Sequence, residues 1–263
     1  MMVHLDRYIL NARVLPMLVV TFPLVLAAYP WLPADAFAKD ELWATAIKWA
    51  TTGASSAFLA TVLSFVPRGF GTRLEEGLWQ EWGGAPATAY LRYAHPELDD
   101  RQTEKLHAKI AKLDHSLHVP LRAEEEANPA AADQCYESMV RMLRARTWGA
   151  KNYPMLFDEN LSYGFRRNLL GIRPIGILAC LIGMWSGVVA IWMGHDAWLV
   201  AALSAAVGAF ILANTPGDVK RQAERYARRL FMTVDLLKPV PKAKPAGTAT
   251  RKKGVAPVPP TPA

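Results

Sequence analysis

FDENLSYGFRRNLLGIRPIGILAC, residues 157–180, passes from a charged, amide-rich segment into an uninterrupted apolar one. Arg166, Arg167 and Arg173 stand just before the change, where long basic side chains can reach the phosphate layer of a bilayer. The apolar part extends to Met193 without an acidic or basic residue. Its length is close to the ~20 residues that cross the hydrocarbon core. We therefore predict a transmembrane helix over 175–193.

Three further blocks, residues 14–32, 49–66 and 197–213, also lack Asp, Glu, Lys and Arg. The chain is 52% hydrophobic, yet its mean hydropathy is only slightly positive because the apolar residues are segregated from the charged ones. Aromatic rings that favour the headgroup level mark the block ends: Tyr29, Trp31, Trp49, Trp192 and Trp198. The sequence predicts a mainly helical, polytopic membrane protein with four transmembrane helices.

Basic residues gather on one side of these spans. They precede spans one and three and follow spans two and four, for example at Arg7, Arg68 and Arg225. The positive-inside rule then places both termini and the long middle segment in the cytoplasm. Cys135 would be cytoplasmic and Cys180 lies within a span, so no disulfide is expected. One alternative stays open: ADAFA at 34–38 resembles a signal-peptide cleavage site, although the preceding apolar block is longer than a usual signal core.

This pattern divides the chain into five parts. Transmembrane helices one and two fill 1–66, a small and mainly helical cytoplasmic domain fills 67–174, and a transmembrane hairpin fills 175–213. An amphipathic cytoplasmic helix follows at 214–237, and a disordered tail rich in Pro, Ala and Lys at 238–263. The basic tail favours anionic lipid as its partner, because no aromatic residues interleave its charges as nucleic-acid binding would require.

Within the middle segment, the sequence predicts a helix over 72–82 that ends at Gly83-Gly84, and a strand or turn over 87–93. Further helices are predicted from Asp99 or Asp100 to Leu113, from Pro129 to about Gly149, and from Pro154 into the quoted stretch. The last of these has an apolar face and should lie along the membrane surface or under the cytoplasmic domain. Its apolar face is formed by Phe157, Leu161, Phe165 and Leu169.

The polar face of that helix has two interpretations. It is either an interfacial anchor with internal ion pairs, or a ligand or partner site coupled to span three. The residues of such a site would be Glu159, Asn160, Tyr163, Arg166 and Arg167. A second candidate is Arg92 beside the glycine-rich WGGAPAT, where backbone amides could meet a phosphate, although a helix stop explains the same glycines.

No catalytic motif is present, so we expect no enzyme activity and no cofactor. His115 and His118 lie one helical turn apart near His107, but no further Cys or His follows at a zinc-like spacing, which favours surface histidines over a metal site. The predicted spans contain no ionisable residue, and this argues against proton-coupled transport.

Small residues recur along the spans and allow two interpretations. They either let helices pack closely or, repeated around an oligomer, line a narrow uncharged pore. Pro23 would bend span one. The small residues are Thr52, Ser56, Ala60 and Ser64 in span two, Gly183 and Gly187 in span three, and Ser204 and Gly208 in span four.

Two motifs, EEGLWQEWGGAPATAYLR and ENLSYGFRRNLLGIRPIGI, are separated by a helical, proline-punctuated segment. Over roughly residues 74–177 the chain resembles an uncharacterised family of bacterial four-span inner-membrane proteins. The resemblance implies a bacterial inner-membrane setting and an association with phage defence, and it implies no particular activity.

Two functions remain as hypotheses. The first is a signal-responsive membrane effector, a homo-oligomer whose cytoplasmic domain controls a channel or pore in answer to a cytoplasmic protein or a nucleotide-type signal. The alternative is a non-conducting anchor or scaffold that presents the cytoplasmic domain to a partner protein.

Overall fold

The computed structural model describes residues 7–32, 41–149 and 151–239. Within these ranges the chain is mainly helical, as predicted, and contains no strand. The ADAFA motif at 34–38 and nearly all of the tail predicted to be disordered lie outside the described residues.

Two helices are long and apolar enough to cross a membrane. The first is Arg7–Trp31, which combines the π-helical η1 (Leu10–Val14), α2 (Leu15–Leu26) and the short η2 (Tyr29–Trp31). The second is α10 (Arg173–Trp192). The spans expected at 14–32 and 175–193 therefore have helices of suitable length.

The other two expected spans belong to bent helix pairs. Helix α3 (Glu41–Val62) is followed by α4 (Val66–Glu81) after a bend of 55°, and α11 (Trp198–Ala213) by α12 (Pro216–Met232) after a bend of 59°. Pro67 and Pro216 lie in the first turns of α4 and α12, where a missing N–H costs no helical hydrogen bond. The chain thus contains two candidate spans, or up to four if each bent pair counts as one.

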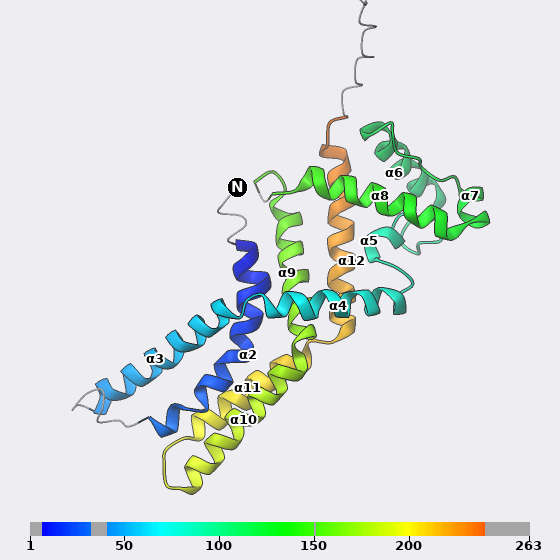
Figure 1. Cartoon of the computed structure of the whole chain (residues 1–263). Coiled ribbons are helices and arrows are strands. Elements are labelled where there is room, and N and C mark those ends of the chain that lie inside the picture. Colours follow the sequence, from blue (N-terminus) through cyan, green and yellow to red (C-terminus); the bar gives the residue numbers. More distant parts are fainter. Residues whose placement is uncertain (1–6, 33–40, 150, 240–263) are drawn as a thin grey trace, which may run out of the picture.

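Helices α10 and α11 form a hairpin, and α2 packs against both α10 and α3. Beyond these helices, α4 and α12 both contact α9 (Pro154–Gly171), with α9 and α12 side by side (Figure 1). Leu78, Leu170 and Val219 join the three helices in one buried cluster. Because α9 also contacts η1, it lies inside a helical bundle.

Four further helices pack around α12 and one another, away from α2, α3, α10 and α11 (Figure 1). They are α5 (Pro86–Ala89), α6 (Asp100–Leu113), α7 (Arg122–Ala127) and α8 (Pro129–Thr147), and we call them the distal module. Its core, which includes Leu91, Ile110 and Tyr136, closes on α12 and on η3 (Thr233–Leu236) through Leu230 and Val234.

Most predicted boundaries in this region are confirmed. Asp99 forms a capping box with Gln102 at the start of α6, and the Asn128 side chain accepts a hydrogen bond from the Ala131 amide at the start of α8. Gly83 and Gly84 have φ values of +76° and +128° and end α4. Residues 87–93 form no strand; they contain α5 and a following turn.

Candidate functional site

The predicted site residues of α9 line two different pockets. Glu159 and Arg166 line the larger one, whereas Asn160, Tyr163 and Arg167 line a smaller one. The split follows from the helical period, because residues one position apart point about 100° apart around the axis. The predicted group is therefore not a single site.

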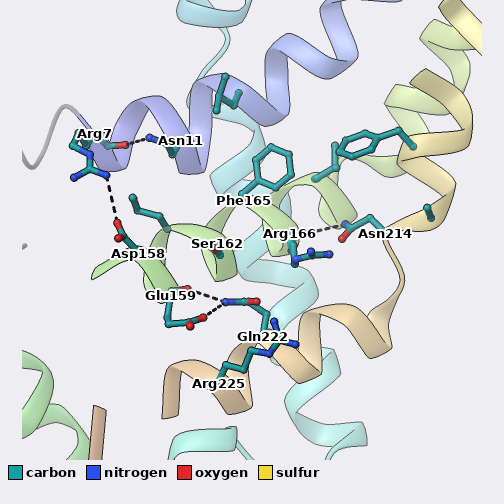
Figure 2. Close-up of a pocket in the computed structure, with 15 residues that line it drawn as sticks. Arg7, Asn11, Asp158, Glu159, Ser162, Phe165, Arg166, Asn214, Gln222 and Arg225 are labelled. Atoms are coloured by element: carbon teal, nitrogen blue, oxygen red, sulfur yellow. Dashed lines mark hydrogen bonds and ion pairs between the residues drawn. The ribbon is translucent and has the colours of Figure 1, made fainter. Parts of the chain in front are cut away.

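The larger pocket, which we call the junction pocket, lies where the Arg7–Trp31 helix, α9 and the bend between α11 and α12 meet (Figure 2). Its volume is about 810 Å³. The polar side chains of its wall come from all three elements and include Arg7, Asn11, Ser162, Arg166, Gln222 and Arg225.

Both acidic residues of the junction pocket already have partners. Arg7 forms an ion pair with Asp158 at 3.4 Å, and the Gln222 amide donates to the Glu159 carboxylate. In contrast, the guanidinium groups of Arg166 and Arg225 form no ion pair with any residue in the described part of the chain. Glu159 keeps its negative charge because its amide partner is neutral, so Arg166, Arg225 and Glu159 together leave the pocket one net positive charge. The two arginines can therefore still bind an anion.

Asn214 holds the backbone of α9 at Arg166. Its Nδ2 donates to the Arg166 carbonyl oxygen at 2.8 Å, and its side chain is buried at the end of α11. This bond ties the α11–α12 bend to the middle of α9, so the wall that carries Arg166 is held against the ends of the membrane helices (Figure 2).

The smaller pocket, about 240 Å³, contains a buried polar network. Arg167 forms an ion pair with Glu75 of α4 at 2.8 Å, with side chains only 11% and 12% exposed. The Tyr163 hydroxyl donates to the same carboxylate, and burial together with this negative charge raises the pKa of Tyr163 above its ordinary value. Asn168 accepts from Arg167 and donates to the Ala12 carbonyl oxygen. Arg167 and Tyr163 therefore connect α9 to α4, and Asn168 connects α9 to the N-terminal helix.

Arg92 is also engaged within the chain. Its Nε and Nη2 donate to the two carboxylate oxygens of Asp133 at 2.8 and 2.7 Å, a bidentate geometry that holds α8 to the turn after α5. A Cβ on Gly84 would lie 2.8 Å from Arg92 Nη2, so the glycine leaves room for this arginine. These contacts give no support to the hypothesis that Arg92 and the backbone amides of WGGAPAT bind a phosphate.

The histidines do not gather around a metal. In the described residues, no group of three or more His, Cys, Asp or Glu side chains could hold an ion. His107 is buried with its Nε2 2.8 Å from the Leu91 carbonyl oxygen, and His118 lies 3.2 Å from a Glu124 carboxylate oxygen.

The small residues of the candidate spans lie at helix contacts within this one chain. Thr52, Ser56 and Ala60 are buried, and Ser64 is half-buried. Thr21 of α2 donates to the Ser56 carbonyl oxygen at 3.2 Å.

Helices α10 and α11 approach each other in the same way. A Cβ on Gly183 would lie 2.3 Å from Ser204 Oγ, one on Gly187 2.7 Å from the Ala201 amide nitrogen, and one on Gly208 3.5 Å from Cys180 Cβ. The contacts are those of close helix packing.

Several residues of the junction pocket are not among the site residues predicted from the sequence. Arg7, Asn11, Gln222 and Arg225 are far from α9 in sequence, so nothing local relates them to it. Gln222 did carry a signal, since it lies three residues after the buried Val219 and next to the buried Ala223 on the apolar stripe of α12. A polar residue at such a position usually has a buried partner.

No protein-family model matches the chain, and neither a curated protein nor a solved structure matches it.

Proposed function

We propose that the chain is a non-conducting membrane anchor that holds the distal module in a fixed orientation for a partner protein. In this proposal it has four spans, both termini and the distal module lie in the cytoplasm, and the setting is a bacterial inner membrane. The observation that carries the proposal is the burial of the hydroxyl-bearing stripe of α3 against α2 within a single chain. Residues used in this contact are not free to line a pore.

The connection between the membrane helices and the distal module also supports the proposal. Helix α9 runs into α10 with only Ile172 between them, and Ile172 is buried. Because α12 contacts α9 and also completes the core of the distal module, the module has a defined position relative to the spans. A rigid connection of this kind suits presentation to a partner.

Ion flux from protein-loaded liposomes tests the proposal. We expect the same flux as from empty liposomes, and we expect Ser56→Leu to reduce folded protein because overfilling a packed contact costs about 1–3 kcal/mol. Ser55→Leu is the matched control, since Ser55 is exposed. Flux that Ser56→Leu blocks while the protein stays folded would contradict the anchor.

The signal-responsive effector, an oligomer that forms a channel or pore in the sequence-based hypothesis, is the second candidate, and one observation favours it. The junction pocket has walls from α9 and from the end of α11, so an occupant would contact the cytoplasmic and membrane helices together. In that case cytoplasmic extract, as a source of signal, should induce flux in the wild-type liposomes, and Arg166→Ala should abolish the response.

A further inference from the structure

An apolar groove lies in the membrane-helix region between α2, α3 and α11. Its volume is about 540 Å³ and its wall is almost entirely apolar. Representative lining residues are Leu18, Phe22, Gly53, Ala57, Val207 and Phe210.

The groove adjoins the junction pocket. Phe210 of α11 lines both. On α2, Leu15 lines the pocket and Leu18, about one helical turn further along, lines the groove. The pocket and the groove therefore lie one after the other between α2 and α11. The junction pocket, near α9, is the polar part, and the groove beyond it is the apolar part.

We propose that this combined space binds one anionic phospholipid, with its phosphate between Arg166 and Arg225 and an acyl chain in the groove. Guanidinium groups bind phosphate oxygens through paired, charge-assisted hydrogen bonds. Basic pockets between membrane helices on the cytoplasmic side suit lipid headgroups. The proposal depends on the membrane location of α2, α3 and α11, and it holds whether the protein is an anchor or an effector.

Other occupants match only part of the space. A soluble phosphate would satisfy the two arginines and leave the groove uncovered. A helix from a second copy could cover the groove, but it would leave the guanidinium groups of Arg166 and Arg225 without an anion. A phospholipid supplies one phosphate and a hydrocarbon chain in a single molecule, so charge and apolar surface are matched together.

Native mass spectrometry of the purified full chain, given equal amounts of phosphatidylglycerol and phosphatidylcholine with identical acyl chains, measures the preference. We expect the wild-type protein to retain one phosphatidylglycerol. Arg166→Gln combined with Arg225→Gln should weaken the preference by roughly fivefold for each arginine removed. The matched control is Arg68→Gln combined with Arg73→Gln, which removes the same charge from exposed positions on α4. The control should keep the preference.

The groove is tested separately with Gly53→Leu. A Cβ on Gly53 meets no atom within 4 Å, so leucine can enter the groove without a clash in the chain. We expect this variant to retain less of either lipid. Gly69→Leu is the matched control, because Gly69 also has open space in front of it but does not line the groove.

Four outcomes would overturn the proposal. They are equal retention of the two lipids by the wild-type protein, an equal loss in the Arg68/Arg73 control, unchanged retention by folded Gly53→Leu, and displacement of the lipid by millimolar inorganic phosphate alone. The last result would indicate a site for soluble phosphate. If the Arg166/Arg225 variant fails to fold by circular dichroism, the lipid preference of the wild type and the Gly53→Leu comparison still decide.

Discussion

At the residue scale, buried polar groups hold α4, α9 and the N-terminal helix together. The Glu75–Arg167 ion pair is almost completely buried, and removing one partner of such a pair leaves an uncompensated charge that typically costs about 3–5 kcal/mol. This explains why Arg167 looks functional in the sequence although its contacts are structural. Arg166, its neighbour, points to the other face of α9 and has no ion-pair partner among the described residues.

His107 gives the distal module a dependence on pH. Burial lowers the pKa of His107 below its ordinary value of 6.5, and its Nδ1 is buried without a hydrogen-bond partner. The unfolded chain therefore takes up a proton at a higher pH than the folded chain does. The contribution of neutral His107 to the free energy of unfolding is therefore fully present above pH 6.5 and is lost as the pH falls below that value.

We predict that the melting temperature of wild-type protein falls between pH 7 and pH 5 more steeply than that of His107→Gln. Glutamine can still donate to the Leu91 carbonyl oxygen but does not titrate. Thermal unfolding followed by circular dichroism measures the difference. The exposed His115, changed to Gln, serves as the control and should behave as the wild type. Equal pH dependence in His107→Gln and wild type would contradict the assignment.

At the element scale, glycine pairs determine how closely helices approach. A Cβ on Gly171 of α9 would lie 2.6 Å from the Gly71 amide nitrogen of α4, so backbone meets backbone at this crossing. The close approach keeps α4 against α9 and places Glu75 within reach of Arg167.

We predict that Gly171→Val destabilises the protein by about 1–3 kcal/mol, because neither backbone can move without loss of contacts. The measurement is chemical unfolding in detergent. Gly77→Ala is the control: it lies in α4 with no atom near its Cβ position, and it should be neutral or stabilise by up to about 1 kcal/mol. A fully stable Gly171→Val would show that the crossing is looser than the structure indicates.

At the scale of the whole molecule, the distribution of charge predicts the orientation in the membrane. We predict that Cys135 in α8 faces the cytoplasm and that His195, in the turn between α10 and α11, faces the opposite side. A thiol reagent that cannot cross the inner membrane should label His195→Cys, in a Cys135→Ser background, in intact cells. In separate cells that carry the protein with its native Cys135, the reagent should label Cys135 only after the membrane is opened. Labelling of Cys135 but not of residue 195 in intact cells would reverse the orientation.

The sequence by itself determined the mainly helical fold, the apolar segments and most helix boundaries between residues 99 and 171. These features depend on local chemistry: runs without charge, caps such as Asp99 and Asn128, and the glycines that end α4. Helical spacing likewise places Tyr136, Met139 and Leu143 on one face of α8, and all three are buried.

Only the tertiary structure decided which polar residues meet. Glu75 and Arg167 are separated by 92 residues and Arg7 and Asp158 by 151, and no local pattern relates residues so distant in sequence. The tertiary structure also divided the polar face of α9 between two pockets and put the small residues of α3, α10 and α11 into contacts within one chain. Periodicity shows which residues share a helix face, whereas the partner of that face depends on how all the helices pack together.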